Sequence, residues 1–181
     1  DRPPEGRVVG DGADGGDGML FTQGGRFGGH GFYILKGHPV YVWNLVDLER
    51  VRWEGAEKLA PGKHKLEFDF TYDGLGFGTF AFNNLSGVGQ SAEGVLKVDG
   101  KEVARQKMEH TIPITLAWDE SQDIGSDTET GVDDADYQPP FPLTAKLNKL
   151  TIKVDRPKLT EEDIKKLDDT QATALDGKPL H

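Results

Sequence analysis

Strict alternation of apolar and polar residues over positions 65–72 constrains the fold of this chain more than any other feature. The polar set is Lys65, Glu67, Asp69 and Thr71, and the apolar set is Leu66, Phe68, Phe70 and Tyr72. Because successive side chains of a strand point to opposite faces, this period of two places one set in a core and the other in water. The pattern predicts a half-buried antiparallel strand.

Short apolar runs between turn residues predict further strands on both sides of this segment. They begin at Met19 and cover residues 32–35, 40–45, 51–53, 95–98, 101–103, 112–118, 143–147 and 150–154, with a bulge at 148–149. Asp99-Gly100 predicts a two-residue hairpin turn, because both central residues of such a turn take a positive φ. So many short strands predict an all-β fold, an antiparallel two-sheet sandwich or concanavalin A-like jelly roll.

The two ends of the chain differ from this middle region. Residues 1–17 are polar and glycine-rich, which predicts a linker or surface loop. The sandwich domain is expected to cover residues 18–156, and residues 157–181 to form a helical tail. Thr160 and Asp163 are spaced like a capping box at the start of a short helix over about 161–169.

Charge and cysteine content exclude several classes of function. The net charge of -10 over 181 residues repels phosphate backbones, so no nucleic-acid partner is expected. No apolar run reaches the roughly 18 residues that a membrane-spanning helix needs, so no membrane partner is expected either. The chain has no cysteine, which excludes disulfides, thiolate metal sites and cysteine nucleophiles.

The segment Gln23–Gly29, which reads QGGRFGG, resembles a stretch near the C-terminus of bacterial arylsulfatases. Segments at 40–44, 59–73, 98–101, 123–128 and 140–144 resemble the same family in the same order. The resemblance spans roughly residues 17–155, and the chain departs from it at 74–94 and in its tail. It implies a non-catalytic C-terminal accessory domain that packs on the sulfatase catalytic domain of the same polypeptide and lines its substrate cleft. It also implies a periplasmic or secreted protein and a sulfated substrate.

The chain itself lacks the chemistry of that family. Sulfatases use a Cys or Ser in a C/S-x-P-x-R context, and no Ser of this chain lies in one. We therefore expect no enzymatic activity from this chain on its own. The alternative function is a carbohydrate-binding module of the laminin G or concanavalin A-like kind. An exposed apolar docking surface would favour the accessory domain, and a concave sheet face with exposed tryptophan would favour the carbohydrate-binding module.

Three residues are candidates for ligand binding. Arg26 stands among glycines, and its guanidinium can bind a sulfate or carboxylate through two parallel hydrogen bonds. An internal ion pair with an acidic residue such as Asp123 or Asp127 is the favoured alternative for this arginine. Trp43 and Trp118 can stack on sugar rings, although core packing is the commoner role of tryptophan in a strand.

An acidic segment at 119–136 is the candidate metal site. It contains eight carboxylates and no Lys or Arg, and the proposed ligands are Asp119, Asp123, Asp127, Asp133 and Asp134. Calcium prefers such oxygen ligands, but the spacing does not match an EF-hand. A solvated loop whose aspartates cap turns is the favoured interpretation, so no cofactor is expected.

Overall fold

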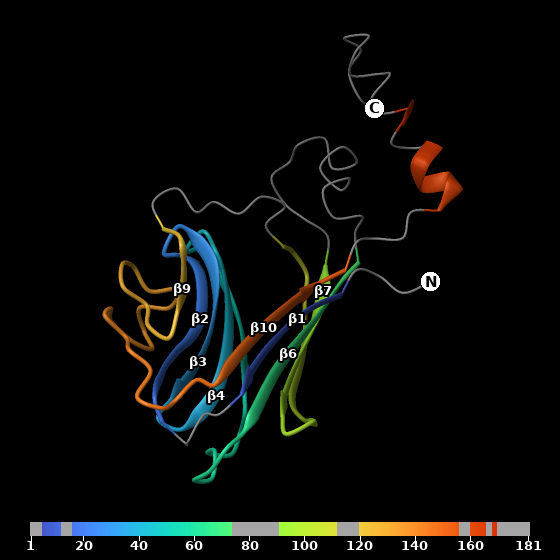
Figure 1. Ribbon diagram of the computed structural model, residues 1–181. Helices are drawn as coiled ribbons and strands as arrows, with labels where there is room; N and C mark the ends of the chain where they lie inside the picture. The colour runs from blue at the N-terminus through green and yellow to red at the C-terminus, as the bar shows by residue number, and fades with distance from the viewer. Residues whose placement is uncertain are drawn as a thin grey trace.

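The computed structural model describes residues 5–11, 16–73, 91–111, 120–155, 160–165 and 168–169. In this part of the chain, two antiparallel sheets face each other, as Figure 1 shows. Sheet A has the strand order β10-β1-β6-β7-β8, and sheet B has the order β5-β4-β3-β2-β9. The strands are β1 (Glu5–Asp11), β2 (Gly18–Gly25), β3 (Gly28–Leu35), β4 (His38–Leu45), β5 (Glu49–Glu54), β6 (Lys65–Tyr72), β7 (Ala92–Val98), β8 (Lys101–Met108), β9 (Gln122–Ile124) and β10 (Lys149–Val154). The predicted all-β, two-sheet sandwich is confirmed.

Strand β6 places its residues as the alternation predicts, with one difference. Leu66 and Phe68 are buried between the sheets, and Phe70 packs against the same core. Glu67 points to the other face, yet only 2% of it is exposed, and its Oε1 lies 2.9 Å from Lys65 Nζ. Asp69, on the same outer face of the strand, is 28% exposed, so the burial is particular to Glu67.

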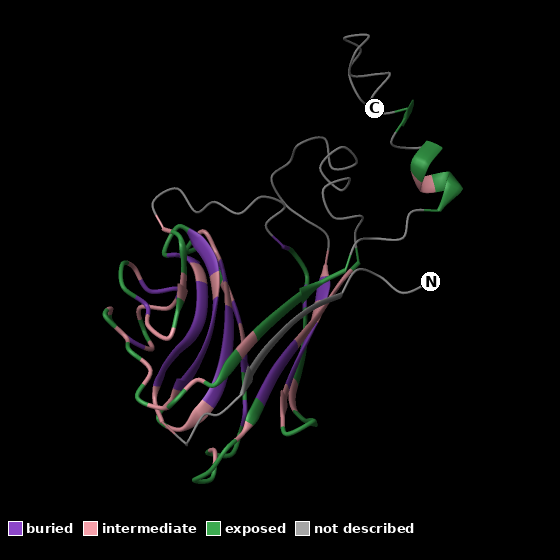
Figure 2. Cartoon of the chain, in the orientation of Figure 1, coloured by how far each residue is buried: buried purple, intermediate pink, exposed green. Residues whose placement is uncertain are grey.

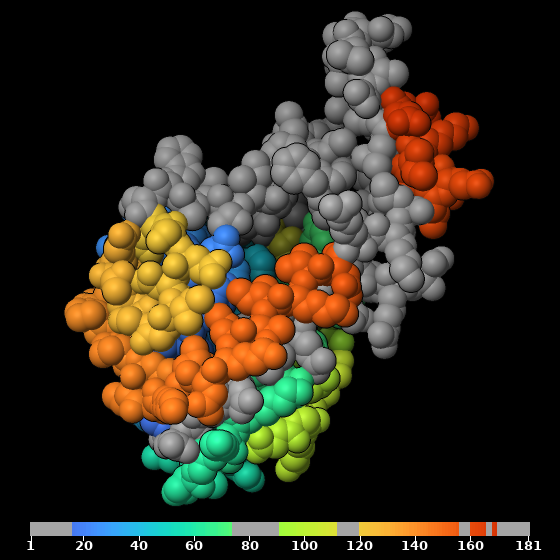
Figure 3. Space-filling model, viewed as in Figure 1, coloured from blue at the N-terminus to red at the C-terminus, as the bar shows by residue number. Residues whose placement is uncertain are grey.

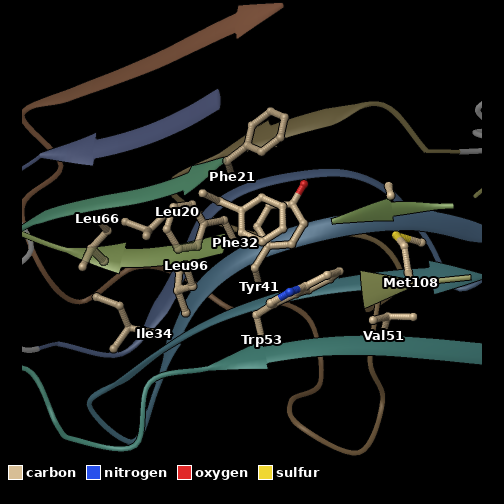
Figure 4. Close-up of a cluster of buried hydrophobic side chains, with 12 residues drawn as sticks. Leu20, Phe21, Phe32, Ile34, Tyr41, Val51, Trp53, Leu66, Leu96 and Met108 are labelled. Carbon is tan, nitrogen blue, oxygen red and sulfur yellow. The ribbon is translucent and has the colours of Figure 1, made fainter. Parts of the chain in front are cut away.

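The main core fills the space between the two sheets, as Figure 4 shows. It consists of Leu20, Phe21, Phe32, Ile34, Tyr41, Val51, Trp53, Leu66, Phe68, Ala92, Leu96 and Met108. Tyr41 of sheet B stacks on Phe68 of sheet A, with ring centroids 3.5 Å apart. Trp53 Nε1 donates a hydrogen bond to the carbonyl oxygen of Gln106, 3.2 Å away. Each large apolar side chain buried in this way contributes about 1.5–3 kcal/mol, so aromatic packing holds the sheets together.

A second apolar cluster lies on the outer face of sheet B. Met19, Tyr33, Val40 and Val42 point away from the main core and pack against Val132, Tyr137 and Phe141. The last three residues belong to the segment 125–142, which we call the cover segment. Figure 3 shows this part of the chain, in yellow and orange, as a continuous surface in front of sheet B. Sheet B is therefore buried on both faces, whereas a sheet of a simple sandwich faces water on one side.

The β7–β8 hairpin forms where Asp99-Gly100 predicted it. Asp99 has a φ of 51° and Gly100 a φ of 81°, the signs that a two-residue turn of type I′ requires. The Asp99 side chain also accepts a hydrogen bond from the backbone N of Lys65, 2.8 Å away. This contact joins the hairpin to the start of β6.

Two predictions about elements are wrong. Residues 1–17 are not all linker, because residues 5–11 form β1, which pairs with β10 and β6 through backbone hydrogen bonds. Residues 143–147 are not a strand. Leu143 instead donates its backbone N–H to Gly125, 2.9 Å away, and packs with Leu147 against the main core from a loop. Apolar alternation therefore reflects burial here without strand pairing.

The C-terminal part agrees with its prediction where the structure describes it. Residues 161–165 and 168–169 are helical, and Thr160 and Asp163 form the expected reciprocal capping bonds. The strand predicted at 112–118 lies outside the described residues, and the domain boundaries at 18–156 and 157–181 stay predictions. Within the described ranges, no helix has the length and apolarity to cross a membrane.

Candidate functional site

The candidate site lies at one end of the sandwich, which we call the open end. Two turns of sheet B meet there, the β2–β3 turn at 25–28 and the β4–β5 turn at 45–48, beside the end of β6 at Tyr72. Asn44 joins these turns because its Nδ2 donates to Gly25 O at 2.9 Å and to Arg26 O at 3.0 Å. Its Oδ1 accepts a hydrogen bond from Asp47 N at 2.9 Å. One buried amide thus fixes both turns relative to each other.

An aromatic stack lines the inside of the open end. Trp43 stacks on His30 of the neighbouring strand and on Phe70 of sheet A, in each case with ring centroids 5.0 Å apart. The indole Nε1 of Trp43 is buried and has no hydrogen-bond partner in the described part of the chain. Because the ring packs against two other rings, Trp43 belongs mainly to the core, as the favoured alternative for a strand tryptophan predicted.

His30 is the titratable group of this stack. Its Nδ1 lies 2.9 Å from Tyr41 Oη, and burial lowers the pKa of the imidazole to about 4. Burial also raises the pKa of the Tyr41 phenol, so Tyr41 stays protonated and donates to Nδ1. His30 is therefore neutral at pH 7, and it contributes packing and a hydrogen-bond acceptor but no charge.

The β2–β3 turn presents Arg26 and Phe27 to solvent. Phe27 is 54% exposed, although it is a large apolar residue. Arg26 is half exposed and forms an ion pair with Asp134 of the cover segment, and its backbone N donates to Thr130 Oγ1 at 3.0 Å. Arg26 therefore has an internal ion pair with an acidic residue, and this residue is Asp134, not one of the two examples named from the sequence, Asp123 and Asp127. The sequence did not single out Phe27, because an aromatic residue next to glycines gives no periodicity signal.

The described carboxylates of the acidic segment accept hydrogen bonds from neighbouring donors. Asp123 accepts from Thr128 N at 3.0 Å and Oγ1 at 2.7 Å. Asp133 accepts from Ala135 N at 3.1 Å. Asp127, Asp134 and Asp136 accept from Tyr137, Arg26 and Tyr33, respectively. Asp123 and Asp133 thus cap local turns, as aspartates of a loop commonly do, whereas Asp127, Asp134 and Asp136 bind side chains farther along the sequence.

Of the proposed metal ligands, the structure describes Asp123, Asp127, Asp133 and Asp134. No group of three or more His, Asp or Glu residues has metal-binding geometry in the ranges that the structure describes. Asp127 is only 1% exposed, and burial raises the pKa of its carboxyl group while the Tyr137 hydroxyl donates to it. A buried carboxylate of this kind locks the cover segment in place. Asp119 and Trp118 lie outside the described residues.

Comparison with known proteins identifies the fold. No protein-family model and no curated protein matches the sequence. The structure is similar to domains LG4-5 of the mouse laminin alpha1 chain, with a TM-score of 0.57, 10% identity, and coverage of 88% of this chain and 39% of that one. Alignment with the LG1-3 region of the laminin alpha2 chain gives a TM-score of 0.46 and 14% identity, over 87% and 29% of the two chains. The chain thus spans well under two thirds of either laminin fragment. It has a jelly-roll sandwich of the laminin G type.

The prediction of a C-terminal arylsulfatase domain is wrong on this evidence. The laminin alpha1 fragment to which the structure is similar consists of laminin G domains, and neither sequence comparison supports a sulfatase. The sulfatase parent and its catalytic domain as a partner are therefore unsupported, and the periplasmic or secreted location stays a prediction from the sequence. The glycines of residues 23–29 have a physical explanation that does not depend on the sulfatase family. Gly24 has a φ of +71°, and a Cβ on Gly29 would lie 2.3 Å from Gln23 O. The geometry of a tight hairpin therefore requires such a stretch, whatever family contains it.

Proposed function

We propose that this chain is a non-catalytic binding module that takes a neutral carbohydrate at its open end. The observation that carries the proposal is the laminin G-type sandwich, which favours the carbohydrate-binding alternative over the accessory domain of a sulfatase. Sulfate-ester hydrolysis of the sulfatase kind has no part in this function, since the chain has neither a cysteine nor a serine in a sulfatase motif.

The chemistry of the open end supports a sugar ligand. Phe27 offers an exposed ring to the C–H face of a sugar, and Arg26 beside it offers guanidinium donors to hydroxyl groups. Asn44 holds this turn in place, since its Nδ2 donates to Gly25 O and Arg26 O. Asn44 also fixes the backbone of both turns before a ligand arrives, which lowers the entropy cost of binding.

The electrostatics favour a neutral sugar over a sulfated one. Asp134 neutralises Arg26, and Asp47 neutralises Arg50 in the next turn. The net charge of the chain is -10, which repels polyanions such as sulfated glycans at moderate ionic strength. A sulfate group would therefore have to displace an internal carboxylate to reach a guanidinium.

A glycan array followed by titration calorimetry tests this function. We expect the chain to bind neutral oligosaccharides and to leave heparin-type glycans unbound. The variant Phe27→Ala should weaken the affinity by about tenfold, which corresponds to the loss of one aromatic contact. Ile124→Ala is the matched control, since Ile124 is 55% exposed on β9, outside both turns of the open end, and has no aromatic ring. Binding to sulfated glycans alone, or equal affinity of Phe27→Ala and the parent chain, would refute the proposal.

A further inference from the structure

Strand β10 is an edge strand of sheet A that exposes apolar side chains. Leu150 packs against the main core, so Ile152 and Val154 point to the same inner face by alternation. Ile152 is nevertheless 44% exposed and Val154 is 78% exposed. Figure 2 shows β10 as a largely green strand at the border of the sheet. An exposed apolar edge strand is a template for pairing with another strand.

The other edges of the two sheets are protected. Strand β8, at the opposite edge of sheet A, carries Lys101, Glu102, Arg105 and Lys107, and Arg105 forms ion pairs with Glu93 and Glu102. Strand β5 is tied to the cover segment by Arg50 and Arg52, and β9 has only three residues. Charges and short strands of this kind commonly prevent edge-to-edge pairing. Among the described strands, β10 is therefore the edge best suited to a partner.

We propose that β10 pairs antiparallel with β10 of a second copy of this chain, with Ile152 opposite Ile152 across a two-fold axis. In this register Leu150 lies opposite Val154 of the second copy, so the three apolar residues of each strand face apolar residues. A two-fold interface uses the same patch on both subunits, and β10 fits that requirement by its own sequence. The two copies of sheet A then form one continuous sheet.

Charge complementarity on the outer face favours the same register. Lys149 lies opposite Asp155 of the second copy, and by symmetry Asp155 lies opposite the second copy's Lys149. Thr151 lies opposite Lys153 of the second copy, so no two lysines are directly opposed. Within one chain, Lys153 Nζ lies 3.5 Å from Asp155 Oδ2. In the dimer, Lys149 and Lys153 of each copy would therefore both lie near a carboxylate. A shift of the register by two residues removes the Lys149–Asp155 pairs, and a shift by one places apolar residues opposite charged ones.

Cysteine cross-linking gives the sharpest test, because the 181-residue chain has no cysteine of its own. Directly opposed residues of an antiparallel pair have Cα atoms about 4.5–5.5 Å apart, which suits a disulfide. Ile152→Cys should therefore form a disulfide-linked dimer under mild oxidation. Val154→Cys is the matched control, since its two copies would lie about 14 Å apart along the strands and should remain unlinked. Cross-linking of both variants, or of neither, would overturn the proposal.

Charge exchange tests the register independently in sedimentation equilibrium. The parent chain should sediment as a dimer at micromolar concentration, and Lys149→Asp or Asp155→Lys alone should weaken the dimer by about tenfold, because each pair occurs twice. The double variant restores the pairs with reversed sign and should regain the parent affinity. These residues are exposed, so the fold is expected to remain. Lys101→Asp on β8 should leave the dimer unchanged. A monomeric parent chain, or a double variant as weak as the single ones, would contradict this interface.

Discussion

At the scale of single residues, the side chain of Asn44 makes hydrogen bonds to Gly25, Arg26 and Asp47. It is fully buried, and its amide group bonds to both turns of the open end. We expect Asn44→Ala to lower the free energy of unfolding by about 2–3 kcal/mol, because it leaves buried backbone groups without partners. Urea denaturation measures this change. Asp47→Asn removes the exposed ion pair with Arg50, keeps a side chain suited to the φ of 60° at this position, and should cost under about 1 kcal/mol. Equal losses in the two variants would contradict the role given to Asn44.

His30 gives the fold a dependence on pH that can be assigned to one residue. Its pKa is about 4 in the folded chain, below the usual value of about 6.5 in an unfolded chain. Between these values the unfolded chain binds more protons, so stability is complete above pH 6.5 and falls as the pH decreases toward 4. We expect a loss of about 2 kcal/mol between pH 7.5 and 5, measured by urea denaturation at each pH.

The variant His30→Gln separates this effect from general acid destabilisation. It removes the imidazole, so the loss of stability between pH 7.5 and 5 should become smaller by about 2 kcal/mol. His38→Gln serves as the control, since His38 bonds to Gly55 O outside the aromatic stack. If His30→Gln retained the full pH dependence of the parent chain, the neutral state of His30 in the folded chain would be disproved.

At the scale of elements, two glycines of the β7–β8 hairpin should lose stability for different reasons when replaced by alanine, one through steric overlap and the other through backbone strain. A Cβ on Gly94 would lie 2.5 Å from the Trp53 ring and 2.7 Å from Phe68, whereas a Cβ on Gly100 would meet nothing within 4 Å. We expect Gly94→Ala to destabilise the chain by about 3 kcal/mol through overpacking. Gly100→Ala should cost about 1 kcal/mol, because only its φ of +81° is strained. Thermal unfolding compares the two, and a larger loss in Gly100→Ala would show that β7 can shift to make room.

The elements also show why the sequence predicts some parts of the fold and not others. Strand β6 and the Asp99-Gly100 turn were predictable because their signals are local, in alternation and in turn chemistry. Strand β1 was not, because it is defined by pairing with 65–71 and 149–154, far away in the sequence. At the site, the sequence marked Arg26 as a candidate but could not find Asp134 as its partner. That contact depends on where the cover segment folds back.

At the scale of the whole molecule, the cover segment adds a third layer to the two-sheet sandwich, on the outer face of sheet B. Its ends are joined to β2, because Met19 N donates to Phe141 O and Gly125 N donates to Leu20 O, each at 3.2 Å. Tyr137 stacks on Phe141 with ring centroids 4.4 Å apart, and its hydroxyl bonds to both Asp127 and Val132. The acidic residues that suggested a metal site thus have a structural use, since they attach this layer to sheet B. The layer also carries Asp134, the partner of Arg26, so it links the open end to the outer face of sheet B.

This arrangement predicts that the cover segment can open without unfolding the two sheets. Tyr137→Phe keeps the ring but removes the hydroxyl that satisfies buried Asp127, so the segment should lose about 1–3 kcal/mol of local stability. Hydrogen exchange should then become faster by about tenfold or more at the amide of Phe141, which donates to Asp127 O at 2.9 Å. The amide of Leu96, in central strand β7 of sheet A, should exchange as in the parent chain. Equal acceleration at Phe141 and Leu96 would instead mean that the cover segment opens only when the whole sandwich unfolds, and the three layers would then form one cooperative unit.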